Sequence, residues 1–172
     1  MAIEFTVFSF EFRYDFVNYE NKTMQKNKPT WLLIAAILQY LTAALHTSGL
    51  FVEQTASNDT EAQLLKLMNE YKIELGAGFH PSMQNLFTSM SISFSLFIVF
   101  GGVLDHFLWK RNPEAGLLKG IVLIQTMIFG IVFLTMACLT FLIPIICTGL
   151  IFLSLLVALV RLRSARTVLS AN

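Results

Sequence analysis

The sequence predicts an all-α protein: an integral membrane four-helix bundle with an outer amphipathic helix between the first and second spans. Of its 172 residues, 55% are hydrophobic and only 13% are charged, whereas soluble domains carry about 25% charged residues. The apolar residues also gather in long runs, each close to the ~20 residues that an α-helix needs to cross a bilayer. The lipid bilayer is therefore the first partner that the sequence implies.

Hydropathy places four spans along the chain. Trp31 opens the first and is expected at the membrane interface, where tryptophan is enriched. Residues 117–160 form an apolar run too long for one span, and Pro144 disfavours one continuous helix, so two spans joined by a tight turn are predicted there. The four predicted spans cover about residues 31–52, 84–108, 117–138 and 142–161.

The stretch between the first two spans, residues 53–83, has a partly helical pattern. Asp59 is expected to cap a helix that Gly76, Gly78 and Pro81 then end. Apolar side chains recur near helical spacing at Ala62, Leu65, Met68 and Ile73. We interpret this segment as an amphipathic cap on the bundle or at the lipid headgroups, with a substrate lid as the alternative.

Basic residues predict the orientation, because loops rich in Lys and Arg stay in the cytoplasm. The outer segment would hold Lys66 and Lys72 among a larger number of acidic residues. The opposite side would hold Arg13, Lys22, Lys26, Lys28, Lys110, Arg111, Lys119, Arg161, Arg163 and Arg166. Both termini are therefore expected on the cytoplasmic side of the cell membrane. A net charge of +1 gives no reason to expect a nucleic-acid partner.

The chain is predicted to form one membrane domain with a tail at each end. Met24 begins a short basic segment before the first apolar run, as a membrane-inserting N-terminus requires, so the residues before it are read as a poorly ordered or misassigned tail. A cleaved signal peptide is the alternative for the first span, but the run exceeds the usual 7 to about 15 apolar residues. The predicted division is 1–23, 24–166 and 167–172.

Polar residues in the first two spans fall on one face of each helix. Such groups are costly in hydrocarbon, so the two faces are expected to pack together. Ala35 and Gly49 share the first face, and Gly102 and Asp105 share the second. This arrangement is interpreted either as a packing seam or as a polar pocket around His46. The candidate pocket comprises Gln39, Thr42, His46, Gln84, Thr88, Ser91 and Ser95.

The remaining polar residues give weaker signals. Gln125 is expected at mid-depth, where it could pair with Gln39. Asp105 lies close to the loop after the second span, so it is expected at the interface, reaching solvent or pairing with Lys110 or Arg111. His46 has no second ligand at metal-site spacing. No catalytic, cofactor-binding or metal-binding residue is therefore assigned.

Three short motifs are similar to those of small, largely uncharacterised bacterial four-helix integral membrane proteins. They are Leu45-His46-Thr47-Ser48-Gly49, Ser82-Met83-Gln84-Asn85-Leu86 and Phe141-Leu142-Ile143-Pro144. The resemblance covers most of residues 30–162. It implies an architecture and supplies no catalytic residue.

Two classes of function remain open. The first is a non-enzymatic accessory or interaction subunit with a protein partner or a second copy, favoured because no nucleophile has an evident base. The second is a small transporter or a membrane oxidoreductase subunit that uses the pocket around His46 for a proton, quinone-like or lipid-like ligand. The missing inverted repeat and the absence of paired Cys or His ligands count against this second class.

Overall fold

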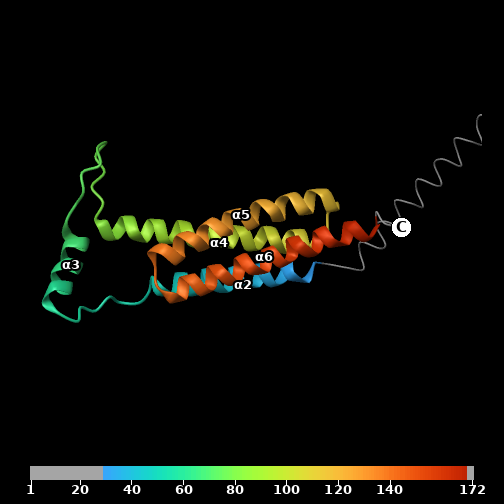
Figure 1. Cartoon of the computed structure of the whole chain (residues 1–172). Coiled ribbons are helices and arrows are strands. Elements are labelled where there is room, and N and C mark those ends of the chain that lie inside the picture. Colours follow the sequence, from blue (N-terminus) through green and yellow to red (C-terminus); the bar gives the residue numbers. More distant parts are fainter. Residues whose placement is uncertain (1–28, 170–172) are drawn as a thin grey trace, which may run out of the picture.

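The described part of the chain, residues 29–169 of a computed structural model, contains five α-helices and no strand (Figure 1). The predicted N-terminal tail, 1–23, lies outside the described residues, as do residues 24–28 and 170–172. The helices are α2 (Thr30–Gly49), α3 (Asp59–Glu70), α4 (Met83–Arg111), α5 (Ala115–Leu139) and α6 (Leu142–Leu169).

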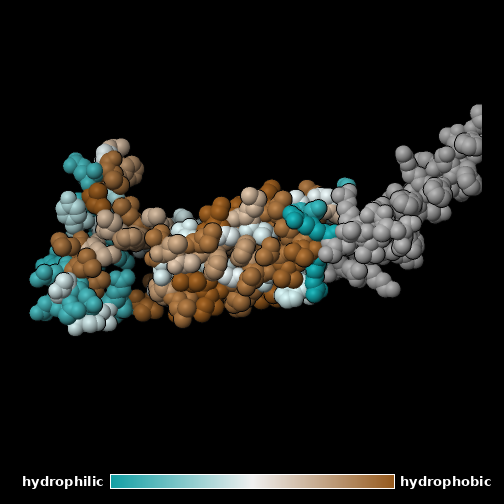
Figure 2. Space-filling model, viewed as in Figure 1, coloured by the Kyte–Doolittle hydropathy of each residue, from teal (hydrophilic) through white to brown (hydrophobic). Residues whose placement is uncertain are grey.

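Four of these helices are long and apolar enough to cross a membrane: α2, α4, α5 and the Leu142–Arg163 part of α6. They begin and end within a few residues of the predicted spans, although α6 continues as a helix to Leu169. Hydrophobic surface covers the four-helix part in Figure 2, and hydrophilic residues gather at its ends. The all-helical prediction with four long apolar helices is therefore confirmed.

The four long helices lie side by side, and α2 packs against both α4 and α6 while α5 packs against α6 (Figure 1). Helices α4 and α5 meet more loosely, through side chains such as Phe97 and Phe129, whose ring centroids are 6.3 Å apart. The buried apolar core draws on all four helices: Leu32, Ala35, Leu108, Leu118, Val122, Phe129, Ile151, Leu155, Ala158 and Leu159.

Local signals in the sequence end and restart the helices. Asn112 adopts the left-handed conformation (φ 44°) after α4, its N–H bonds to the carbonyl of Leu108, and Pro113 follows. The predicted tight turn between the last two spans lies at Thr140 and Phe141. Pro144 falls in the first turn of α6, where its missing N–H costs no helical hydrogen bond.

Helix α3 corrects two expectations about the outer segment. Its N-cap is Asn58, whose side chain accepts a hydrogen bond from the Glu61 N–H at 2.9 Å, so Asp59 is the first helical residue and not the cap. The helix ends at Glu70, so Ile73 lies outside the helical stripe and its N–H bonds to the carbonyl of Pro81 instead.

A tight turn at Gly76, Ala77 and Gly78 closes the segment after α3. All three residues have positive φ, which glycine adopts at no steric cost and alanine adopts rarely. The turn sends the chain back antiparallel to itself, so that Lys72 pairs with Ser82 just before α4 begins. The segment after α3 is therefore closed by backbone pairing as well as by the glycines and the proline on which the prediction relied.

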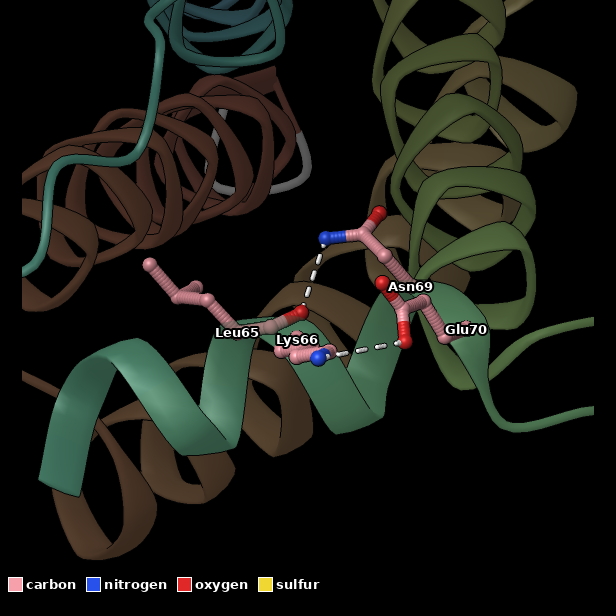
Figure 3. A network of polar contacts seen from close by, with 4 residues as sticks. All are labelled: Leu65, Lys66, Asn69 and Glu70. Atoms are coloured by element: carbon pink, nitrogen blue, oxygen red, sulfur yellow. Dashed lines mark hydrogen bonds and ion pairs between the residues drawn. The ribbon is translucent and has the colours of Figure 1, made fainter.

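No residue of α3 is buried, and its internal contacts are local (Figure 3). The Asn69 side chain donates to the carbonyl of Leu65 at 2.9 Å, and Lys66 lies 4.0 Å from Glu70 with both side chains largely exposed. An exposed pair of this kind contributes at most about 0.5 kcal/mol. Leu65 and Met68 are half-buried and Leu64 is exposed, so apolar side chains point in more than one direction.

Candidate functional site

Two adjacent glycines bring α2 and α4 into close contact. A Cβ at Gly102 would lie 3.3 Å from the backbone oxygen of Ala36 and 3.0 Å from the Tyr40 ring. A Cβ at Gly101 would overlap Oε1 of Gln39. Small residues let helix backbones approach this closely in apolar surroundings. The polar faces of the first two spans therefore pack together, as their helical phases predicted.

The centre of this contact is a hydrogen bond between two fully buried side chains. Nε2 of Gln39 donates to Oδ2 of Asp105 at 2.6 Å, and both residues are 0% exposed. Gln125 of α5 is 7% exposed, and its amide N–H is directed toward the same carboxylate, outside the geometry of a hydrogen bond. Three helices thus bring one carboxylate and two amides together, which we call the central polar cluster.

Most polar atoms of the central polar cluster have no hydrogen-bond partner among the described residues. Oδ1 of Asp105 and Oε1 of Gln39 are buried without one, as are both polar atoms of the Gln125 amide. A buried polar group without a partner costs about 1–3 kcal/mol. Such groups are rare in folded proteins, and each one raises the question of a missing water or ion.

The central polar cluster lies near the middle of α2 and about two turns before the end of α4. Gln39 is nine residues after the start of α2 and ten before its end. At 1.5 Å per residue it is therefore roughly 14 Å from either end of the helix. Asp105 is about 9 Å of helix before the end of α4 at Arg111, and its side chain turns inward against α2.

The expectation that Asp105 reaches solvent or pairs with Lys110 or Arg111 is wrong. Asp105 is 0% exposed, and neither Lys110 nor Arg111 forms an ion pair with it. Lys110 and Arg111 are exposed, and the Arg111 guanidinium lies over the Phe107 ring at 5.8 Å. The physical reason is rotational phase, because Asp105 shares the face of Gly102 and Ser95 that α2 covers.

A second, smaller group of polar residues surrounds His46 nearer the other end of α2. The half-buried His46 ring meets Phe94 edge to face, with centroids 5.2 Å apart, and its Nε2 is buried without a hydrogen-bond partner among the described residues. Thr47 donates from Oγ1 to Oγ of Ser95 at 3.1 Å. The sequence interpretation did not include Thr47, because it lies one residue off the chosen stripe.

The predicted pocket is divided in the structure. Gln39 belongs to the central polar cluster, Ser95 lies near His46, and Thr42 is half-buried between the two levels. Thr88 and Gln84 lie about 10 and about 16 Å from Ser95 along α4, while α2 ends two residues after Thr47. The start of α4 therefore extends past the end of α2, and these two residues lie beyond the level of His46.

Ser91 and Gln84 are half-buried, and Oε1 of Gln84 has no hydrogen-bond partner among the described residues. Ser91 lies one turn from Ser95 on α4, closer to the level of His46 than Gln84 is. Only part of the predicted pocket, at Ser91 and Ser95, is thus within reach of the His46 level.

Several hydroxyl groups elsewhere in the spans donate hydrogen bonds to the backbone of their own helices. Thr126 and Thr148 are buried, and each donates to the backbone carbonyl four residues earlier, at 2.7 Å. Ser89 and Ser93 make the same kind of bond. Within the described ranges, no group of three His, Cys, Asp or Glu side chains is placed to hold a metal ion.

The groups of the central polar cluster can form hydrogen bonds with a ligand. A carboxylate held by an amide N–H has one free oxygen, and the neighbouring amide offers both a donor and an acceptor. The helical phase of α4 already indicated that Asp105 faces α2, because it shares a face with Gly102 and Ser95. The sequence interpretation gave more weight to the closeness of Asp105 to the basic loop.

No known protein family, curated protein or solved structure matches this sequence. Any function proposed for the chain must therefore be argued from its own residues.

Proposed function

We propose that this chain is a multi-pass protein of the cell membrane, with both termini in the cytoplasm, that acts as a non-enzymatic accessory or interaction subunit. Support for the orientation comes from one end of the helical bundle, where α4, α5 and α6 carry Lys110, Arg111, Lys119, Arg161 and Arg163. The Arg161 guanidinium lies 5.5 Å from the centre of the Trp31 ring. Basic and aromatic residues together are typical of a cytoplasmic membrane interface.

The opposite end supports an outer location for the segment between α2 and α4. Helix α3 carries Asp59 and Glu61 in its first turn, and it lies at the end of the bundle away from the C-terminus (Figure 1). Its half-buried Leu65 and Met68 are suited to a headgroup-level cap. In this proposal α3 is the amphipathic cap that the sequence predicts.

The interaction role is supported by a difference between the glycines of the spans: some are covered by a neighbouring helix, and others are not. Gly130 lies against Phe152 and Gly149 against Phe133, so each meets a side chain of the adjoining helix. Gly116 and Gly120 of α5 are exposed, and a Cβ at either would meet nothing within 4 Å among the described residues. They form a GxxxG pattern, which in membranes lets a second helix approach closely.

Two further observations favour a surface for another protein over an enzyme. Only five of the 25 residues of α5 are buried, so most of this helix faces outward. The hydroxyls of Ser89, Ser93, Thr126 and Thr148 donate to backbone carbonyls, and none of them is paired with a base. The partner would be a membrane helix of another subunit or of a second copy.

Purification from native membranes in mild detergent tests this role. The unchanged chain should retain a stoichiometric protein partner, or run as an oligomer, by mass spectrometry and light scattering. Gly116→Leu with Gly120→Leu should weaken that association at least about tenfold, because two large side chains block a close helix approach. Ala137→Leu, on an exposed position of the same helix, is the matched control and should leave it unchanged. A monomer without any partner would refute the proposal.

A small transporter is the second candidate, and Asp105 is the observation that favours it. An ionisable residue buried among candidate spans is costly, and in membrane proteins such residues mark ion and proton pathways. In this candidate the binding pocket is the central polar cluster and not the surroundings of His46, because the buried carboxylate and its unpartnered neighbours meet there. Uptake of ions or solutes into vesicles carrying the purified chain would separate this role from that of an accessory subunit.

A further inference from the structure

We propose that Asp105 holds a proton on Oδ1 and donates it to Oε1 of Gln39, so that a carboxylic acid and an amide join α4 to α2 through two hydrogen bonds. The pair is then a proton-binding site, occupied at neutral pH, and release of the proton breaks one of the two bonds. The inference deepens the transporter candidate by naming a proton as its ligand, and it rests on the proposed insertion of α2 and α4 in a membrane.

The first argument is that two buried oxygens of one side-chain pair lack a donor. Nε2 of Gln39 donates to Oδ2 of Asp105 at 2.6 Å, yet Oδ1 of Asp105 and Oε1 of Gln39 have no hydrogen-bond partner among the described residues. When the carboxyl group is ionised both oxygens are acceptors, so neither can satisfy the other. One proton on Oδ1 makes it a donor and gives both oxygens a partner.

The second argument is where these two oxygens lie. A Cβ on Gly101 would overlap Oε1 of Gln39, so this oxygen lies against α4 at Gly101. Gly101 is one turn before Asp105 on the same face of α4, and helical side chains point toward the preceding turn. An amide and a carboxyl group are both planar and similar in shape, so the pair accommodates two parallel hydrogen bonds.

The third argument is that the groups facing Asp105 are uncharged at neutral pH. From α2 these groups are the Gln39 amide and the Tyr40 ring, which lies against Gly102. From α5 it is the Gln125 amide, whose N–H is directed toward the carboxyl group. An isolated carboxylate in apolar surroundings is far more costly than a hydrogen-bonded neutral acid, so such a group takes up a proton instead.

No basic side chain of the described residues is buried beside Asp105. Lys119 of α5 is half-buried, and no ion pair joins it to Asp105. On α2, His46 lies seven residues beyond Gln39, about 10 Å along the helix. The described basic side chains of α4 and α6 are exposed, whereas Asp105 is 0% exposed: His106, Lys110, Arg111, Arg161 and Arg163. A proton bound to Asp105 itself balances the charge without any of them.

Release of the proton should loosen the contact between α2 and α4. The O–H bond of the acid breaks, the proton passes to water, and Oδ1 of the carboxylate that remains repels Oε1 of Gln39. Proton binding and helix contact are coupled, because a ligand held only by the native state raises its stability. The unfolding equilibrium constant should therefore rise about tenfold per pH unit, over the pH range in which the native chain holds this proton and the unfolded chain does not.

Infrared spectroscopy of the full purified chain in lipid nanodiscs at neutral pH tests the proton directly. A protonated carboxyl group has a carbonyl stretching band that a carboxylate lacks. This band should be present in the unchanged chain and lost in Asp105→Asn. Asp59→Asn is the matched control, because it makes the same chemical change at an exposed carboxyl group of α3, and it should leave the band in place.

Stability distinguishes a neutral acid from an ionised one. The Asn amide has an acceptor in the place of Oδ2 and an N–H donor in the place of the protonated Oδ1, so Asp105→Asn should keep both bonds to Gln39. It should match the unfolding temperature of the unchanged chain at neutral pH and lose the dependence of stability on this proton. Asp105→Leu leaves the Gln39 amide buried without a partner and should lower the unfolding temperature by about 4 °C or more.

Gln39→Met provides a second variant in case Asp105→Asn does not fold. It keeps the length of the side chain and removes both hydrogen bonds to the acid. The carbonyl band of Asp105 should then move to higher frequency, because its C=O no longer accepts the Gln39 N–H. A band that stays at the same frequency in Gln39→Met would refute Gln39 as the partner of the acid.

Absence of the protonated carboxyl band at neutral pH would overturn the inference, and so would an Asp105→Asn variant as unstable as Asp105→Leu. Uptake by vesicles is measured separately from the infrared band. A band that depends on Asp105 without any proton-dependent uptake would refute the transporter candidate and leave this site standing. Proton-dependent uptake that persists in Asp105→Asn would overturn the assignment of this proton as the ligand of the transporter.

Discussion

The α2–α4 contact and the α5–α6 contact are both built on glycines, yet they are filled in opposite ways. Between α5 and α6, Phe152 covers Gly130 and Phe133 covers Gly149, and the two rings stack at 6.1 Å with only 7° between their planes. Between α2 and α4, the glycines meet Gln39, Tyr40 and the backbone at Ala36. At its glycines the α5–α6 contact is aromatic, whereas at its glycines the α2–α4 contact is largely polar.

In the proposed membrane setting, the difference shows two ways in which helices associate when the solvent is itself apolar. Hydrophobic burial gives little driving force between helices in lipid, so packing and hydrogen bonds must hold them together. The reciprocal pairing of Phe and Gly relies on shape alone. The Gln39–Asp105 bond adds a polar contact whose loss leaves a buried carboxylate without its donor. We therefore expect the α2–α4 contact to tolerate substitutions less well.

The largest expected effect compares one glycine from each contact. Gly102→Leu should lower the free energy of unfolding by about 3 kcal/mol, because its nearest neighbours include the backbone of Ala36, which cannot move aside. Gly149→Leu should cost about 1 kcal/mol, since the neighbouring Phe133 ring is a side chain and half-buried. Unfolding of both variants in mixed micelles measures the difference, and equal costs would contradict the comparison.

A smaller effect is expected when the polar bond itself is removed. Gln39→Leu should cost about 2 kcal/mol, because Asp105 remains buried without its donor. Adding Asp105→Leu should recover at least half of that loss, since replacing both partners with apolar groups removes the unpaired carboxylate. The double-mutant cycle is measured by unfolding at one fixed salt composition. If the double variant were less stable than Gln39→Leu alone, the bond would not be the reason for the cost.

The smallest effect belongs to the other end of the same contact. Thr47→Val removes the hydrogen bond to Ser95 and keeps the shape of the side chain, so it should cost about 0.6 kcal/mol, the average for such bonds between membrane helices. The same unfolding assay applies, with Thr135→Val as an exposed control whose hydroxyl bonds only within α5. A cost above that of Gln39→Leu would place the main polar contact near His46 instead.

Much of the fold was readable because hydropathy and helix ends are local properties. Runs of apolar residues located the four long helices to within a few residues, and Asn112, Pro113 and Pro144 lie where helices end or begin. The phases of Gln39, Gly102 and Ser95 also predicted which faces of α2 and α4 meet. The outer segment was harder, because Asn58 and Asp59 are both good caps and backbone pairing ends α3 earlier than its glycines indicate.

The sequence by itself determined that this chain forms four long apolar helices and that the polar faces of the first two pack together. Only the tertiary structure decided that Asp105 is buried against Gln39 and faces Gln125, and that Gln84 and Thr88 lie beyond the end of α2. The physical reason is that burial depends on which neighbour covers a residue and at what level the two helices meet. Periodicity gives the direction of a side chain around its own helix, whereas the offset between helices is set by the packing of the whole bundle.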